Sequence, residues 1–158
     1  MNSDYAFISR WPVALSREQL WDVVDELLAS DDPLVWWPSV QISGYDGTSM
    51  QLRVPSLFGY AVSFTLSDLE AQRPKSLRFA STGDLRGSGT ISFVEDGAAA
   101  CHLRIDWRVS TERGWMRRTA WLLRPVFVTG HHLAMRRGRR SLTAWLDQRE
   151  SRGGPDIV

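Results

Sequence analysis

The feature of this sequence that most constrains its fold is a change of hydrophobic period at residue 39. From there to residue 111, six segments alternate apolar and polar residues, as strands do when one sheet face is buried and the other is wet. Such strands are typical of an antiparallel sheet. Turn-forming pairs, among them Asp46-Gly47 and Asp96-Gly97, separate the segments. The pattern predicts strands at residues 40–45, 48–55, 58–71, 76–84, 85–96 and 99–111.

The segments on either side complete a simple order. A β-prone stretch at residues 5–13 predicts a first strand, and residues 15–30 predict a helix capped by Ser16 and Gln19. A second short helix is expected at residues 31–38, before Pro38 ends it. The pattern is helical again from about Thr111 to Arg149, with a break or kink expected at Pro125. We therefore expect one α+β domain over residues 1–150 and a flexible C-terminal tail at 151–158.

Composition bounds the class of protein. A chain of 158 residues with 43% apolar and 23% charged residues is ordinary for one globular domain. The single cysteine, Cys101, excludes an internal disulfide. We find no secretory signal and no apolar run long enough to span a membrane, so a cytoplasmic protein is expected.

Four stretches in this order resemble one known superfamily. They are "LWDVVDELLASDDPLVWWPSV", "STGDLRGSG", "IDWRV" and "LLRPVFVTGHHLAMRRGRRSLTAWL". Together with the order of elements, they are similar to the START-like (SRPBCC) superfamily, and within it to the polyketide cyclase/dehydrase branch. The resemblance covers nearly the whole chain. It implies a helix-grip fold, in which a curved seven-stranded antiparallel sheet wraps around a long C-terminal helix, with two short helices after the first strand.

The resemblance also implies an apolar cavity between sheet and helix. Alternation and helical spacing select the side chains that would face it, and Trp36 or Trp37 would close its mouth. The expected ligand-binding residues are Trp36, Trp37, Tyr60, Phe64, Phe79, Phe93, Trp107, Phe127, His131 and Met135. We expect this cavity to bind a small hydrophobic molecule such as a lipid, a quinone or a polyketide-like compound. The alternative is a cyclase or aromatase that folds and dehydrates a poly-keto chain there.

The stretch "GHHLAMRRGRR" at residues 130–140 separates into two faces when placed on a helix that turns about 100° per residue. His131 lies at the centre of an apolar face, and Gly138 on that face would let the helix approach the sheet. His132 and the arginines point away. His131 is then either a polar handle for a ligand or a structural histidine bonded to a sheet carbonyl or a water. Resemblance to relatives implies Asn-His-Asp at residues 130–132, of which only His131 is present.

Other chemistry finds little support in the sequence. Adjacent histidines on a helix point about 100° apart, so they cannot form a helical zinc pair, and we expect no metal and no cofactor. There is no G-x-S-x-G elbow and no phosphate-binding P-loop. Cys101 and His131 could form a catalytic pair only if the last strand and the helix brought them together, and a buried structural cysteine is the simpler interpretation. No catalytic residue is identified.

Charge divides unevenly along the chain. Residues 1–100 hold 7 basic and 13 acidic side chains, a net charge of −6, whereas residues 101–158 hold 12 and 5, a net charge of +7. Arg136, Arg137 and Arg140 could therefore dock an acidic protein, such as the acyl carrier proteins of similar cyclases. Nucleic-acid binding through this helix is a weaker third alternative, because no aromatic stacking pattern or known reading motif accompanies the arginines.

Overall fold

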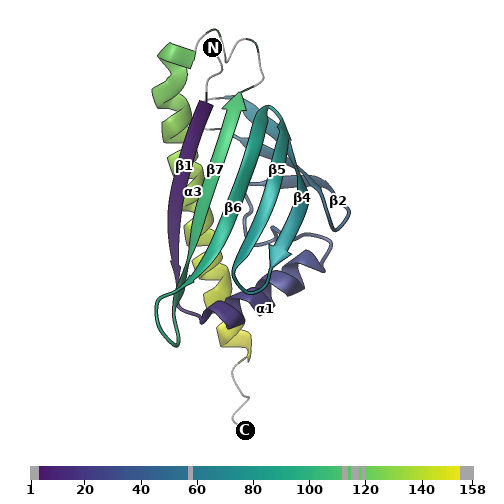
Figure 1. Ribbon diagram of the computed structural model, residues 1–158, viewed down its shortest axis with the longest axis vertical. Helices are drawn as coiled ribbons and strands as arrows, with labels where there is room; N and C mark the ends of the chain where they lie inside the picture. The colour runs from purple at the N-terminus through teal and green to yellow at the C-terminus, as the bar shows by residue number, and fades with distance from the viewer. Residues whose placement is uncertain (1–3, 57–58, 112–113, 115–117, 119, 154–158) are drawn as a thin grey trace.

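A computed structural model describes residues 4–56, 59–111, 114, 118 and 120–153 of the chain (Figure 1). Within these residues, nine elements follow one another in the order strand, helix, six strands, helix. They are β1 (Asp4–Val13), α1 (Arg17–Leu28), β2 (Gln41–Tyr45), β3 (Met50–Pro55), β4 (Ala61–Gln72), β5 (Ser76–Gly83), β6 (Leu85–Glu95), β7 (Cys101–Thr111) and α3 (Ala120–Gly153).

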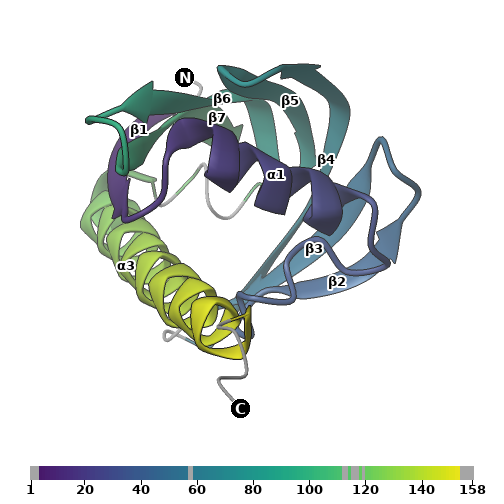
Figure 2. The same ribbon diagram turned by 90° about the horizontal axis from the view of Figure 1, so that it is seen from below.

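The strands form one antiparallel sheet of seven strands in the order β1-β7-β6-β5-β4-β3-β2. The first strand pairs with the last, so β1 and β2 are the two edges although they follow each other in the sequence. Figure 2 shows the sheet curving around an inner space, with α3 along the open side and α1 across one end. The predicted α+β fold, with a curved seven-stranded antiparallel sheet and a long C-terminal helix, is confirmed.

An irregularity in β4 contributes to the curvature. Asp68 has a φ of 52°, and the register between β4 and β5 shifts between Ser67 and Glu70. Bulges of this kind bend the strand and increase its twist. Aspartate is one of the few residue types that adopt this left-handed conformation readily. The bulge therefore lets a single strand of 12 residues follow the bend of the sheet.

Helix α1 begins where the sequence predicts it. The Ser16 side chain accepts a hydrogen bond from the Gln19 N–H at 3.1 Å, and the Gln19 side chain accepts one from the Ser16 N–H at 3.0 Å. This reciprocal capping satisfies two backbone donors that the helix itself leaves unpaired. Leu20 and Trp21 are the fully buried residues of the helix, so α1 is anchored to the sheet near its start.

Two boundaries differ from the expectation. Residues 31–40 form hydrogen-bonded turns rather than a second short helix: the Asp32 carbonyl accepts from the Val35 N–H and the Leu34 carbonyl from the Trp37 N–H. Both bonds run from residue i+3 to residue i, as in turns, and Pro38 has no N–H with which to continue a helix. At the other end, α3 continues through Gly153, so residues 151–153 belong to the helix and not to a tail, whereas 154–158 lie outside the described residues.

The expected helical stretch from about Thr111 is tested only in part, since Gly114 and Arg118 are helical and α3 runs from Ala120. Thr111 is the last residue of β7, and most of residues 112–119 lie outside the described part of the chain. Pro125 is the sixth residue of α3 and has no N–H to donate to the carbonyl of residue 121, so one hydrogen bond near the start of the helix is missing. No helix among the described residues is long and apolar enough to cross a membrane.

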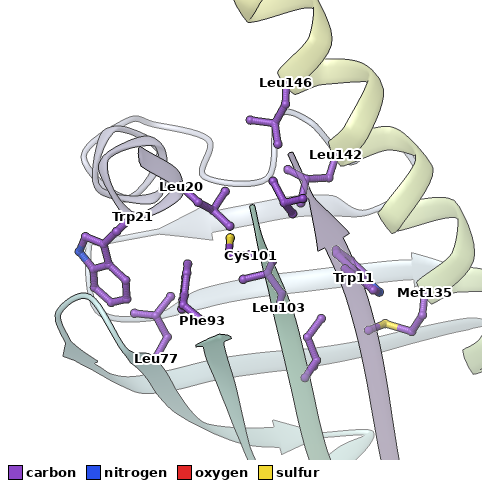
Figure 3. Packing of buried hydrophobic residues seen from close by; sticks show 12 residues of the cluster. Trp11, Leu20, Trp21, Leu77, Phe93, Cys101, Leu103, Met135, Leu142 and Leu146 are labelled. Carbon is purple, nitrogen blue, oxygen red and sulfur yellow. The ribbon is translucent and has the colours of Figure 1, made fainter. Parts of the chain in front are cut away.

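Two apolar clusters hold the layers together. The larger one joins α1, the β1, β5, β6 and β7 strands and α3, and Figure 3 shows Leu20, Phe93, Cys101 and Leu142 among its members. The smaller one is centred on Met50, Leu52 and Phe64 of β3 and β4. The helix α3 contributes buried residues only to the larger cluster, so the β2–β4 half of the sheet is not filled by the helix.

Gly138 fixes the closest approach of α3 to its neighbours. A Cβ added there would lie 2.6 Å from Cζ2 of Trp37 and 2.9 Å from Cη2 of Trp11. The two rings are held in turn, because Trp37 stacks on Trp36 with centroids 5.3 Å apart and meets Trp11 edge-on at 5.7 Å. The expected close approach at Gly138 is confirmed, with tryptophan rings as the surface that the helix meets.

We predict that Gly138→Ala lowers the free energy of unfolding. An alanine would favour the helix by about 1 kcal/mol, but forcing a methyl group against two packed rings typically costs 1–3 kcal/mol. Urea denaturation followed by circular dichroism measures the balance. Gly153→Ala is the control, since an added Cβ there meets nothing within 4 Å and should be neutral or slightly stabilising. A Gly138→Ala protein as stable as the Gly153→Ala protein would contradict the tight contact.

Candidate ligand-binding site

A cavity of about 370 Å³ lies between the sheet, α1, the 33–40 turns and α3. Every strand from β3 to β7 contributes side chains to its wall, as does β1. This volume falls within the range typical of sites that bind small molecules. The cavity exists because the curved sheet and α3 meet at the larger apolar cluster and diverge elsewhere.

The structure places all ten expected ligand-binding residues on this wall: Trp36, Trp37, Tyr60, Phe64, Phe79, Phe93, Trp107, Phe127, His131 and Met135. They come from the turns after α1, from β4, β5, β6 and β7, from the residue before β4, and from α3. Alternation along β7 is as expected, with Cys101, Leu103, Ile105 and Val109 buried and Arg104 and Arg108 exposed. That these residues bind a ligand stays a prediction.

Several wall residues were not among those expected. Tyr5, Phe7 and Trp11 line the cavity from β1, and Val23, Val24, Leu27 and Leu28 line it from α1. The residues of β1 could have been predicted from the sequence "YAFISRWPV". Its inward residues Tyr5, Phe7, Trp11 and Val13 alternate with exposed ones. The α1 residues lie on one apolar face of the helix, which lines the cavity and also packs against the larger apolar cluster.

A glycine in the middle of the sheet makes room for two aromatic rings. Gly89 of β6 pairs with Phe79 on one side and with Trp107 on the other. A side chain at Gly89 would collide with the Phe79 ring. Because Gly89 is bare, Phe79 and Trp107 meet across it, with their centroids 6.2 Å apart and their planes at 67°. The absence of a side chain at Gly89 therefore leaves room for the Phe79 ring on the cavity wall.

His131 lies on the inward face of α3, as the helical wheel predicts. Its ring stacks on Phe7 with centroids 3.7 Å apart and planes 17° from parallel, and it tilts toward Trp107 at 6.2 Å. His132, by contrast, is exposed. Nε2 of His131 is buried and has no hydrogen-bonding partner among the described residues. A structural hydrogen bond from this nitrogen to a sheet carbonyl is therefore not part of the fold.

Burial keeps this imidazole neutral. Removal from water lowers the pKa of His131 from 6.5 to about 4, and the neighbouring His132 lowers it further in the same direction. A neutral imidazole carries one N–H donor and one acceptor nitrogen. At neutral pH, His131 can therefore offer a hydrogen bond to an uncharged polar group but does not bring a positive charge into the cavity.

Besides His131, four wall residues hold buried polar atoms without a partner in the described part of the chain: Tyr5, Trp37, Trp107 and Thr111. The Tyr5 hydroxyl, the Thr111 hydroxyl and Nε1 of Trp107 are all buried. Tyr5 pairs with Val109 and Phe7 with Trp107 across β1 and β7, so these groups gather near the end of β7 and close to His131. Burial raises the pKa of the Tyr5 phenol, which therefore stays protonated and able to donate. Three of these four groups thus lie near His131 at one end of the cavity, whereas Nε1 of Trp37 belongs to the turns after α1.

Two buried side chains that lie off the wall, Ser81 and Cys101, are not available to a ligand. The Ser81 hydroxyl donates to the Leu85 carbonyl at 2.6 Å and does not line the cavity. Cys101 is 1% exposed, also lies off the wall, and packs in the larger apolar cluster. Burial raises the pKa of its thiol to about 11, so it is not a thiolate at neutral pH. Six residues of strand, roughly 20 Å, separate it from Trp107 beside His131, so the two do not form a catalytic pair.

The arginines of α3 do not all behave alike. Arg136, Arg137, Arg139 and Arg140 are exposed, as the wheel predicts. Arg137, however, also contributes to the cavity wall, although its Cα direction points away from the apolar face. The proposed docking of an acidic protein at Arg136, Arg137 and Arg140 stays a prediction. Among the residues that the structure describes, no three His, Cys, Asp or Glu side chains are grouped so that they could hold a metal ion.

Comparison with known proteins bears on the fold. No protein-family model and no curated protein matches the chain. Among solved structures, the Zhui aromatase/cyclase from Streptomyces sp. R1128 is 13% identical with a TM-score of 0.71, over 96% of this chain and 99% of that one. A START superfamily protein from Mycobacterium smegmatis is 14% identical with a TM-score of 0.62, over 90% and 97%. A point mutant of norcoclaurine synthase from Thalictrum flavum is 15% identical with a TM-score of 0.59, over 93% and 98%.

These likenesses cover nearly the whole of each chain, and at such low identity they show the fold alone. The chain therefore has a START-like, helix-grip fold, as the resemblance in its sequence implied. Members of one fold differ widely in what they bind and catalyse, so function must be argued from the cavity wall.

The buried, neutral state of His131 predicts a pH dependence of stability. Its pKa of about 4 lies below the ordinary value near 6.5, so between these values the unfolded chain binds a proton that the folded chain does not. The free energy of unfolding should then be constant above pH 6.5 and fall as the pH drops toward 4, by at most about 3 kcal/mol. Urea denaturation at half-unit pH steps should show a flatter profile for His131→Leu.

His132, the exposed neighbour of His131, provides the control for this series of urea denaturations. His132→Ala removes only the smaller of the two causes that lower the pKa of His131, so it should keep most of the wild-type slope between pH 4 and 6.5. Profiles of equal slope for wild type and His131→Leu would mean that His131 is solvated in the folded protein, which contradicts its burial.

Proposed function

We propose that the protein binds a small hydrophobic molecule in the cavity between the sheet and α3. The observation that carries this proposal is the wall itself, which is built from apolar and aromatic side chains around about 370 Å³ of space. Apolar surface without a packing partner is unfavourable in water, so a ligand that removes it from water gains roughly 25 cal/mol per Å² buried. Lipids, quinones and polyketide-like molecules have the size and the polarity that such a wall selects.

The polar end of the cavity supports an orienting role for His131. Nε2 of His131, the Tyr5 hydroxyl, the Thr111 hydroxyl and Nε1 of Trp107 have no partner among the described residues. A buried donor or acceptor left unpaired costs about 1–3 kcal/mol, and a ligand oxygen placed there would recover part of it. We infer that the ligand carries an uncharged oxygen, a carbonyl or hydroxyl, at this end, with His131 as its main polar contact.

A polyketide cyclase or aromatase is the second candidate. It is favoured by the likeness in fold to the Zhui aromatase/cyclase, whose TM-score is 0.71. Such an enzyme would hold a poly-keto chain in a conformation that favours one ring closure over the others, and a polar group would assist proton transfer. With a pKa of about 4, however, His131 is a weak base at neutral pH. Binding is therefore the better supported function, and the release of an aromatic product from a poly-keto substrate would reverse this order.

The fluorescence of Trp107 tests the binding proposal. Trp107 lines the cavity and packs on Phe64 and Phe79, so an apolar ligand there should change its emission. We expect a fatty acid, a quinone or a polyphenol to change tryptophan emission saturably, and Trp107→Phe to remove a substantial part of that change. Trp11, Trp36 and Trp37 also line the cavity and account for the remainder.

Trp145 supplies the matched control. It lies on α3 outside the cavity wall, with the Arg149 guanidinium over its ring at 5.0 Å. Trp145→Phe should leave the ligand-induced change intact. If none of the compounds alters emission or displaces an uncharged solvatochromic dye, the protein does not bind apolar ligands and the proposal is wrong.

A further inference from the structure

The cavity wall contains a single side chain that is charged at neutral pH. Apart from Arg137, the described residues that line the cavity are apolar, aromatic or uncharged polar, and they include no Asp, Glu or Lys. His131 is neutral because burial lowers its pKa to about 4. A ligand in this cavity therefore meets one formal charge, and that charge is positive.

Arg137 lies at the mouth of the cavity, where the wall is exposed to solvent. The exposed members of the wall are Ser39 in the turns after α1, Pro55 at the end of β3, and Arg137 on α3. These three elements belong to the side of the molecule where α3 faces the β2–β3 edge of the sheet (Figure 2). The guanidinium is thus placed where the apolar wall gives way to solvent.

The Arg137 guanidinium is not neutralised by the protein. No ion pair or hydrogen bond joins its side chain to another described residue. Helix α3 carries no acidic residue before Asp147, whereas Arg136, Arg139 and Arg140 add positive charge nearby. In the facing turns, Oδ1 of Asp32 accepts the Leu34 N–H at 3.0 Å and so caps its own loop. An anion at the mouth would find the Arg137 guanidinium without a partner among the described residues, with Arg136, Arg139 and Arg140 on the same helix.

We propose that the ligand is an amphipathic carboxylate, with its carboxylate bound by Arg137 at the mouth and its apolar part inside the cavity. This inference rests on the proposed function and names the ligand class. A guanidinium binds a carboxylate through two parallel N–H···O hydrogen bonds. The interior offers a carboxylate no cation, and burying an unpaired charge is strongly unfavourable. Charge therefore sets the orientation: the head stays outside and the tail enters.

The competing role for Arg137 is purely apolar. Its methylene stem could cover the rim of the cavity while the charged end remains in water. In that case the charge would not affect which ligand binds. Arg137→Met separates the two roles, because methionine keeps an unbranched apolar stem and removes the guanidinium.

The experiment compares two probes of equal chain length, dodecanoate and 1-dodecanol, at pH 8. Each displaces Nile red, an uncharged dye, from the full-length protein, and the midpoint gives its apparent affinity. We expect wild type to bind dodecanoate about tenfold more tightly than the Arg137→Met protein does, the usual worth of a charge-assisted hydrogen bond. Affinity for 1-dodecanol should be equal in both. Arg140→Met, which removes an exposed charge one turn away and off the wall, is the control and should change neither affinity by more than about twofold.

Other outcomes overturn the proposal in distinguishable ways. Equal weakening for both probes in Arg137→Met would assign Arg137 the apolar role. Unchanged affinity for both probes would show that the guanidinium contacts no ligand, and equal losses of dodecanoate affinity in Arg137→Met and Arg140→Met would show only a diffuse positive field. In these three cases the cavity still binds and the proposed function stands. Failure of both probes, and of the dye itself, to bind wild type would overturn the proposed function together with the inference.

Discussion

The separation between α3 and the sheet depends on one contact, in which the rings of Trp11 and Trp37 lie against the bare backbone of Gly138. A larger residue at 138 would push the helix outward, and smaller residues in place of the tryptophans would let it close onto the sheet. From this point toward its C-terminus, α3 buries Leu142 and Leu146 in the larger apolar cluster. From the same point toward its N-terminus, it passes over the cavity with Ala134, His131 and Phe127 on its inner face. The bulk of the Trp11 and Trp37 rings at Gly138 thus keeps the cavity beneath the N-terminal half of α3 open.

The electrostatics of the cavity follow from the same geometry. His131 lies on the sheltered face of α3 beneath Phe7, where burial removes its charge. Arg137 lies six residues further along, about 9 Å of helix rise, where the wall meets solvent and a guanidinium keeps its charge. One helix therefore presents an uncharged hydrogen-bonding group inside and a cation outside. A ligand that satisfies both has an apolar body, a neutral oxygen at one end and an anionic group at the other.

Much of the fold could be predicted from the sequence because its signals are local and periodic. Period-two alternation identified the inner faces of β4 and β7, and the helical wheel placed His131 and Gly138 inward and His132 outward, as the structure has them. The second short helix was predicted wrongly, because residues 31–40 form separate turns with bonds from residue i+3 to residue i, and Pro38 cannot continue them. Arg137 was assigned to solvent because a wheel records the direction of Cα–Cβ bonds and not the reach of a long side chain.

Periodicity predicts which residues point inward, but it cannot predict which of them pack in the core and which line the cavity. Phe93 is 3% exposed and packs on Trp21, yet it also borders the cavity, and no local pattern separates it from Phe79 or Trp107. That distinction depends on how far α3 stands from the sheet, which is set by contacts between residues more than 100 positions apart, such as Trp11 and Gly138. The role of Gly89 likewise emerges only when β5 and β7 are placed on either side of it.

Native mass spectrometry tests the central claim most directly. The full-length protein, purified without denaturant or detergent, should carry one small apolar molecule per chain or take one up from a mixture of fatty acids and quinones. In the Ala134→Trp variant, a large side chain on the α3 wall should occupy the cavity. This variant should bind no ligand while keeping its fold, as measured by circular dichroism. A wild-type protein that has the bare chain mass before and after incubation, or an Ala134→Trp variant that binds as wild type does, would contradict a ligand-binding cavity between sheet and helix.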